Sequence, residues 1–443
     1  MGAMSDRRFL AWMAAALVLG LALAFPGAPA LGEGPDPAYP TCKPPPPETG
    51  PSYSLRAETV LRALERPDRE DGKDRLILPA YEVLSADAET GGSDLSVHLL
   101  GWGRKDLAGA DHFKKSEDGE LLHGYLEYGR DQGYFRIRGG RQNILAAGAN
   151  ETVDGVRLLA SPLAWMDLDM YGGLPVSVEK LDGVDGDSMY GGRLGFRPLA
   201  RTVLGLSFKE LADDGENARR ETGLDFAVPL PAGAEIRGMG TYNLKREGMS
   251  EHFLESLVPL GPFSLRPFWE RYDLDNLFDT VADSAKPFSF LALTDDTLTG
   301  AGLEAGFLSL PMWETAVKFT RYDREEAGET SWHGLARITA RPWESSRIGL
   351  EAGRLDGPGE MGYTLGRLFS WWGFSKGYVS GEGMVAVFDE EIYGSKESWH
   401  VILSAGRNLV KALALSLSGE YRQTPYYDSD LRVTLLLTAR GGR

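Results

Sequence analysis

The sequence predicts an all-β protein, a closed antiparallel transmembrane β-barrel of about 20 strands, with 18 to 22 allowed. Tight turns recur about every thirty residues, and longer acidic loops lie midway between them. The segments between turns and loops alternate apolar and polar residues, as strands of an up-and-down barrel do. Most of the tight turns carry a proline: Pro162, Pro198, Pro229, Pro259, Pro311 and Pro342.

The alternation has a period of two and is clearest near the C-terminus. In the strand expected from Ala412 to Arg422, Leu415 and its neighbours at odd positions are apolar, whereas Ser416 and the even positions are small or polar. One face stays apolar for about nine to eleven residues, which is the length of a tilted strand that crosses a bilayer. The expected strand starts lie near residues 95, 120, 133, 151, 163, 188, 201, 219, 233, 249, 262, 298, 312, 330, 344, 360, 375, 395, 411 and 427.

A soluble antiparallel sandwich also alternates, because one face of each sheet is buried. The long strands here show no division into two sheets, and aromatic residues gather at strand ends, as in the girdles of membrane barrels. We therefore expect the apolar face to meet lipid. The aromatic residues are Trp102, Trp165, Trp313, Trp332, Trp343, Trp371, Trp372 and Trp399.

The N-terminus has the pattern of a secretory signal peptide, expected at residues 1–30. Arg7 and Arg8 precede an apolar run at residues 9–25, and Ala28-Pro29-Ala30 fits a small-x-small cleavage site. No other segment approaches 18 apolar residues. An exported chain with barrel strands is expected in the outer membrane of a Gram-negative bacterium, in contact with its lipid.

Residues 31–53 are rich in proline and predict an extended periplasmic linker. A short amphipathic helix is expected at residues 54–67, with Ser54 as its N-cap and apolar residues at helical spacing. This helix would dock on the rim of the barrel, or act as a plug or as a docking peptide for a partner. The barrel domain is expected at residues 78–443, although its first strand is poorly defined.

Composition excludes several classes of function. The net charge of -17 argues against nucleic acid as a partner. The single cysteine, Cys42, allows no intramolecular disulfide, and no haem-attachment motif is present. No His-x-Ser motif or metal-ligand spacing stands out, so we expect neither an enzyme, a metal site nor a cofactor. The six histidines are scattered: His98, His112, His123, His252, His333 and His400.

Projecting the polar face of each strand inward gives a lumen with charges of both signs. This mixture favours a polar, water-filled interior, because a selective filter needs a ring of one sign. The longest loop, Asp273 to Thr297, could also fold inward as a constriction. The pore-lining candidates are Arg104, Glu127, Arg136, Arg138, Asp167, Asp169, Glu235, Arg237, Glu314, Lys318, Arg337, Arg347, Glu351, Glu420, Arg422 and Arg432.

Three short segments carry a family resemblance: Arg138-Gly139-Gly140-Arg141-Gln142, Val153-Asp154-Gly155-Val156 and Met170-Tyr171-Gly172-Gly173-Leu174-Pro175. There the chain resembles porin-like outer-membrane barrels, some of which are similar to the barrel of porin–cytochrome conduits. The resemblance implies a channel for small hydrophilic solutes or ions, or alternatively a sheath around a multihaem cytochrome partner. The chain departs from such barrels at its end, where Arg443 replaces the usual aromatic residue.

Overall fold

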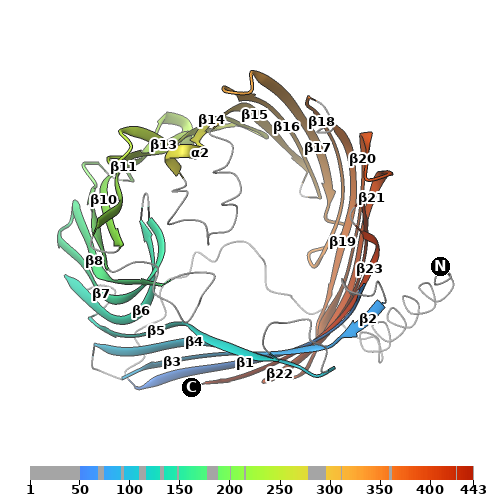
Figure 1. Cartoon of the computed structure of the whole chain (residues 1–443), viewed down its shortest axis with the longest axis horizontal. Helices are drawn as coiled ribbons and strands as arrows, with labels where there is room; N and C mark the ends of the chain where they lie inside the picture. The colour runs from blue at the N-terminus through green and yellow to red at the C-terminus, as the bar shows by residue number, and fades with distance from the viewer. Residues whose placement is uncertain are drawn as a thin grey trace.

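A computed structural model describes residues 50–67, 74–90, 94–108, 116–129, 134–146, 149–176, 188–199, 201–213, 216–277, 296–310, 312–358, 362–425 and 427–442. Antiparallel strands follow one another around a wide central lumen (Figure 1). The strands are β1 (Ser52–Pro67), β2 (Asp74–Ile77), β3 (Pro79–Glu89), β4 (Leu95–Asp106), β5 (Glu117–Tyr128), β6 (Phe135–Ala146), β7 (Ala149–Leu163), β8 (Met166–Val176), β9 (Ser188–Phe196), β10 (Val203–Asp213), β11 (Glu216–Pro229), β12 (Glu235–Asn243), β13 (Gly248–Leu260), β14 (Phe263–Asp273), β15 (Thr297–Leu310), β16 (Trp313–Arg324), β17 (Glu329–Ala340), β18 (Ser346–Asp356), β19 (Tyr363–Phe374), β20 (Gly377–Ile392), β21 (Ser395–Val410), β22 (Leu413–Thr424) and β23 (Tyr427–Gly442).

The wall closes between its first and last strands. β1 pairs with β23 from Ser54↔Gly442 to Leu64↔Arg432. β2 and β3 pair with the same edge of β1 in one unbroken register, so they are two parts of a single strand. The 23 strand segments therefore form a closed antiparallel barrel of 22 strands, which removes every free edge at the ends of the sheet.

The predicted strand pattern is confirmed. Each of the twenty expected starts lies within three residues of the start of a strand between β4 and β23. β1 begins and β23 ends at the same rim of the barrel, which we call the terminal rim. We call the opposite rim the loop rim. The prolines of the tight turns that fall in described residues all lie at the terminal rim: Pro162, Pro198, Pro229, Pro259 and Pro342.

The predicted helix at residues 54–67 is wrong, because this segment is strand β1. Its apolar residues divide between the two faces, with Leu61 outward and Val60 and Leu64 inward, since strand neighbours alternate. As a strand, the segment gains backbone hydrogen bonds from β3 and β23 together, which a short isolated helix lacks. The barrel thus begins at Ser52 rather than at residue 78. The expected signal peptide, the linker up to residue 49 and Cys42 lie outside the described residues.

Helical structure in the described residues amounts to the 3-10 turn η1 (Pro231–Gly233) and the single turn α2 (Leu274–Leu277). Within those residues no helix is long and apolar enough to cross a membrane.

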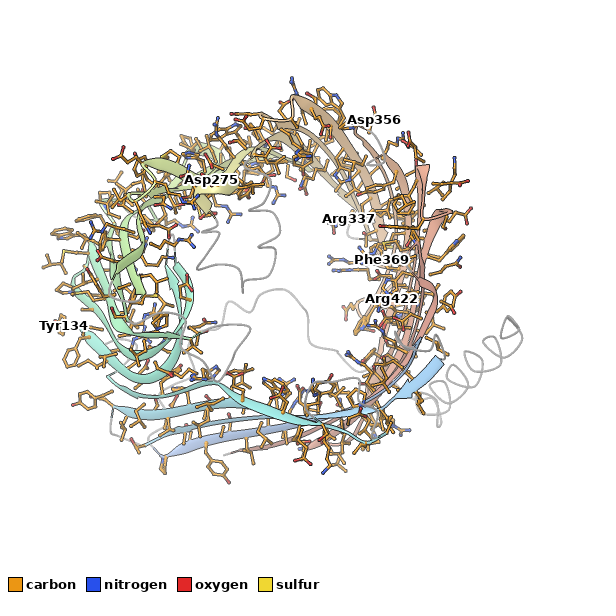
Figure 2. All side chains as sticks on the ribbon, viewed as in Figure 1. Tyr134, Asp275, Arg337, Asp356, Phe369 and Arg422 are labelled. Carbon is orange, nitrogen blue, oxygen red and sulfur yellow. The ribbon has the colours of Figure 1, made fainter. Side chains whose placement is uncertain are left out.

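The two faces of the wall differ as the alternation requires. Val317, Leu350 and Leu368 lie outward on β16, β18 and β19, and each is at least 50 % exposed. Arg337 and Arg422 point into the lumen (Figure 2). The outer face is therefore apolar along the middle of these strands, and the inner face is rich in charged groups.

One region departs from the regular wall. β5 pairs with β6 over only five residue pairs, from Gly124↔Arg141 to Tyr128↔Ile137. Beyond Arg141, β6 leaves β5 and continues with β7 into the interior, where Figure 1 shows the labelled end of β6 inside the ring of strands. We call the described residues at the end of this hairpin, 141–146 and 149–154, the flap.

Glycines crossing the sheet allow this bend. Gly140 has a φ of 128°, which favours glycine, and it pairs with Gly155 on β7. A Cβ on Gly155 would lie 2.1 Å from the carbonyl oxygen of Gly172 on β8, and Gly155 also pairs with Gly173. This row of glycines forms a crease about which the flap folds inward.

Candidate functional site

The register places all sixteen predicted lumen residues on the inner face. Arg337 and Arg422 point inward in Figure 2. When the register is followed from strand to strand through directly opposed residues, each of the other candidates lies on the same face as these two arginines. That these side chains line the path of a solute remains a prediction.

Ion pairs join the inner face from strand to strand. Glu127 on β5 accepts from Arg138 on β6 and lies 3.9 Å from Arg136. Further along the wall, Arg237 pairs with Glu255 between β12 and β13. These contacts neutralise opposite charges across neighbouring strands. Other inner-face pairs include Arg157–Asp169 at 2.6 Å, Arg197–Asp167 at 2.7 Å, Arg266–Glu304 at 2.6 Å, Arg337–Glu314 at 3.9 Å, Arg367–Glu351 at 3.8 Å, Arg367–Glu382 at 2.9 Å, Arg422–Glu420 at 3.1 Å and Arg432–Asp430 at 2.7 Å.

Three of the predicted residues are not joined to an acid or base in the part of the chain that the structure describes. Lys318 lies 4.7 Å from the centroid of the Phe268 ring. Glu235 and Arg347 have no ion-pair partner among the described side chains. Excess charge on the lumen wall is therefore local, and it does not form a ring of one sign.

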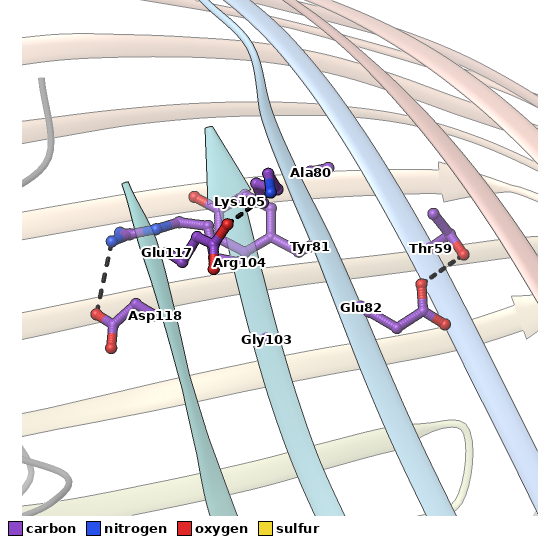
Figure 3. Close-up of a pocket in the computed structure, with 9 residues that line it drawn as sticks. All are labelled: Thr59, Ala80, Tyr81, Glu82, Gly103, Arg104, Lys105, Glu117 and Asp118. Carbon is purple, nitrogen blue, oxygen red and sulfur yellow. Dashed lines mark hydrogen bonds and ion pairs between the residues drawn. The ribbon is translucent and has the colours of Figure 1, made fainter. Parts of the chain in front are cut away.

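A pocket of about 600 Å³ near the loop rim shows how the two faces alternate (Figure 3). On β4, Arg104 faces the lumen and lies 3.5 Å from Asp118, whereas the next residue, Lys105, faces outward and lies 2.5 Å from Glu117. On the outer side Thr59 donates to Glu82 at 2.6 Å. Polar groups that pair across neighbouring strands thus line much of the pocket.

The flap is the principal feature of the interior that the sequence analysis missed. Its inner-face residues Ile144 and Val153 are at most 1 % exposed and form a cluster with three inner-face residues of the wall. Those wall residues come from β8, β9 and β10 and are Tyr171, Met189 and Leu211. Because two inner faces pack together, the flap lies within the lumen, against β8 to β10.

A buried charge network also holds the flap against the wall. Lys209 on β10, 4 % exposed, lies 3.2 Å from Glu151 of the flap and 2.9 Å from Glu221 on β11. Arg219 lies 2.7 Å from the same Glu221. Removing one partner of such a network leaves an uncompensated buried charge, which is strongly destabilising.

The opposite face of the flap turns toward the open lumen and is polar. Arg141 donates to both carboxylate oxygens of Asp154, at 2.8 Å each, and Thr152 donates to Asn143 at 3.0 Å. Arg141 also reaches back to β5, where the Leu121 carbonyl oxygen accepts at 3.0 Å. The flap therefore presents a hydrogen-bonding surface with paired charges.

A sequence signal for the flap exists. Between the terminal rim and the crease, the outward positions of β6 and β7 are apolar, as at Ile137 and Val156. Between the crease and the end of the hairpin, the same face carries Arg141 and Asp154. The alternation keeps its register but inverts its polarity at Gly139-Gly140 and at Gly155, which a strand that faces lipid throughout does not do.

The predicted constriction by the loop Asp273 to Thr297 falls mostly outside the described residues, which stop at residue 277 and resume at 296. Its first turn is fixed to the wall, because the Asn276 carbonyl oxygen accepts from Asn243 at 3.1 Å and from Ser250 at 3.2 Å. Among the described residues, no group of three His, Cys, Asp or Glu side chains could hold a metal ion.

No protein-family model matches the chain, and no curated protein matches it in sequence. Solved structures resemble it at low identity. Acinetobacter baumannii OccAB4 has a TM-score of 0.44 at 9 % identity, over 89 % of this chain and 99 % of that one. Pseudomonas aeruginosa OpdK gives 0.42 at 10 %, over 88 % and 99 %. The translocation pore of the P pilus usher PapC gives 0.49 at 8 %, over 88 % and 99 %.

These TM-scores are all below 0.5, and the identities do not exceed 10 %. The architecture follows instead from the strand register and from the pairing of β1 with β23. The chain is thus characterised by its own hydrogen bonding, as a closed antiparallel barrel of 22 strands with an inward flap.

Proposed function

We propose that this chain is a passive channel in the outer membrane of a Gram-negative bacterium, for small hydrophilic solutes or ions. The observation that carries the proposal is the division of the closed wall into an apolar outer face and a charged inner face. Lipid can surround such a wall because its strands pair with one another around the closed ring, with the short seam between β5 and β6 as the exception. Water and polar solutes can occupy the other side.

The width of the barrel and the flap together support a restricted pore. Barrels of 16 to 18 strands already leave an aqueous channel, and those of about 22 strands need their lumen narrowed or plugged. The flap narrows this lumen from the side of β8 to β10, and its lumen face is polar. Because the wall charges are mostly paired, the channel discriminates weakly between anions and cations.

Conductance of the purified protein in planar lipid bilayers tests this proposal. We expect discrete current steps with weak ion selectivity, and swelling of proteoliposomes in small neutral sugars but not in large ones. A protein that is folded but electrically silent contradicts it. If such a silent barrel also retained haem after gentle extraction, the sheath function would replace the channel.

A further inference from the structure

A serine, a histidine and an aspartate meet on the lumen face near the terminal rim. Ser96 and His98 lie on β4, and Asp87 lies opposite His98 on β3. The Ser96 hydroxyl lies 2.9 Å from His98 Nε2, and His98 Nδ1 lies 2.7 Å from an Asp87 carboxylate oxygen. The imidazole therefore bridges a hydroxyl and a carboxylate through its two nitrogens.

The contacts suit the neutral tautomer of His98 that carries its proton on Nδ1. An ionised carboxylate only accepts hydrogen bonds, so Nδ1 carries the proton that Asp87 accepts. Nε2 then has the lone pair, and the Ser96 hydroxyl donates to it. This is the arrangement in which an imidazole acts as general base for a serine nucleophile.

Neighbouring side chains hold the three groups in place. Ser54 of β1 donates to the second carboxylate oxygen of Asp87 at 3.2 Å. The His98 ring stacks on Tyr125 of β5, with centroids 4.8 Å apart and planes 27° apart. The site also stays open to the lumen, because the His98 side chain is 21 % exposed and that of Asp87 is 47 % exposed.

A carboxylate lies beside the nucleophile and is paired with a cation. Glu127 is directly opposite Ser96 on β5, and it accepts from Arg138. The Arg138 guanidinium carbon lies 5.1 Å from the centroid of the Tyr125 ring, the same ring that supports His98. Arg138 thus offsets the negative charge of Glu127, which would otherwise disfavour an oxyanion that forms next to Ser96.

We propose that Ser96, His98 and Asp87 form a hydrolytic site for carboxylic esters that enter the lumen. The Ser96 oxygen attacks the ester carbonyl carbon while its proton passes to His98 Nε2. The tetrahedral intermediate collapses, the alcohol leaves with that proton, and an acyl-serine remains. Water then attacks the acyl-serine, gives a proton to Nε2 and releases the carboxylic acid, after which Ser96 recovers its proton. The net reaction is ester plus water to acid plus alcohol.

The surroundings indicate the ester class. Next to His98 along β4, the inward residues are Leu100 and Trp102, and Val83 of β3 lies opposite Trp102. These side chains are half-buried and form an apolar strip on the inner face beside His98. An ester with a short aliphatic or an aromatic acyl group places that group on the strip and its carbonyl carbon at Ser96.

This inference goes against the expectation from sequence that the chain is no enzyme. The sequence has the order Ser96-Val97-His98, which is not the His-x-Ser motif. Spacing along the chain also does not indicate which acidic residue would accompany the two. Asp87 reaches His98 only because β3 and β4 pair with these two residues opposed.

The test uses the full-length protein, folded in detergent and in proteoliposomes. Hydrolysis of p-nitrophenyl acetate, butyrate and palmitate is followed, and a fluorophosphonate probe marks any activated serine. The variants are Ser96→Ala, His98→Gln and Asp87→Asn. The matched control is His400→Gln, since His400 also faces the lumen and contacts a carboxylate, Glu420, at 3.2 Å. Heat-modifiability on gels reports the folded barrel in every variant.

We expect turnover of the short esters, a probe adduct on Ser96, and loss of turnover by at least about 100-fold in Ser96→Ala and His98→Gln, as for removal of a nucleophile or general base. Asp87→Asn should lower kcat with little change in KM, because Asp87 orients the imidazole and does not touch substrate. His400→Gln should keep the rate. Equal rates in wild type and Ser96→Ala, or an adduct on another residue, would overturn the proposal. Conductance that persists in Ser96→Ala separates this outcome from failure of the channel function.

Discussion

Arg141 and Asp154 form a two-bond ion pair on the outward side of β6 and β7, yet this side faces the lumen because the sheet folds at the glycine crease. Gly139 and Val156 lie two residues nearer the terminal rim, on the same face of the two strands. At that point the face is still turned toward the membrane. One pair of strands thus serves two environments.

The Arg141–Asp154 pair should influence ion selectivity. Asp154→Asn removes one negative charge and leaves the Arg141 guanidinium in the lumen, so the reversal potential in a salt gradient should shift toward anions. Asp389→Asn is the matched control, because Asp389 also binds an arginine through two contacts of 2.6 Å, with Arg354, but on the outer face. A shift of equal size in both variants would show that the flap does not line the ion path.

The glycine crease should not tolerate a side chain at Gly155. A Cβ there would lie 2.1 Å from the Gly172 carbonyl oxygen, so Gly155→Ala should destabilise the barrel by about 1–3 kcal/mol, as overpacking does. Gly139→Ala is the control, because no atom lies within 4 Å of a Cβ at that position. Urea unfolding in detergent, followed by heat-modifiability, measures both. Equal midpoints would mean that no crease constrains the hairpin.

Leu415 and Ser416 test the assignment of faces on β22. An arginine at Leu415 places a charge on the lipid side near the terminal rim, where the cost lies below the roughly 2–4 kcal/mol of the bilayer midplane. An arginine at Ser416 faces the aqueous lumen and should cost much less. The yield of folded barrel in lipid vesicles compares the two. Similar losses would contradict the register of Leu415 with Leu437.

Arg337 and Arg347 should bias the passage of ions. Arg337 points into the lumen, with Glu314 3.9 Å away, and Arg347 shares the inner face on the neighbouring strand. Changing both to glutamate should move selectivity toward cations, measured again as reversal potential. Arg354→Glu, on the outer face of the same strand as Arg347, should leave it unchanged. If Arg354→Glu shifts the reversal potential and the double variant of Arg337 and Arg347 does not, the assignment of inner and outer faces on β18 is wrong.

The period of two was sufficient to predict the strands from β4 to β23, because apolar and polar residues alternate along them, even in β6 and β7, where the two faces exchange polarity at the crease. It failed at β1 because Val60 and Leu64 put apolar groups on the inner face too. There they meet an inner-face patch of β23 and β3, where Val60 lies opposite Leu436 and Tyr81. Apolar residues on both faces imitate the spacing of an amphipathic helix.

The interior was less predictable than the wall. Ion pairs such as Arg141–Asp154 depend on which strands are neighbours and in what register, and the contact of Lys209 with Glu151 joins residues 58 apart. Residue types alone do not give these distances. Pattern inversion at Gly155 marks where the hairpin bends, but the surface that covers Ile144 emerges only once β8 to β10 curve around it.

The short contact between β5 and β6 also decides where the wall is mechanically weakest. This seam has five residue pairs, whereas the seam between β1 and β23 has eleven. Under heat or lateral tension a sheet separates first where the fewest hydrogen bonds resist. The barrel should therefore rupture inside the chain, between Glu117 and Arg141, while its two distant ends remain joined.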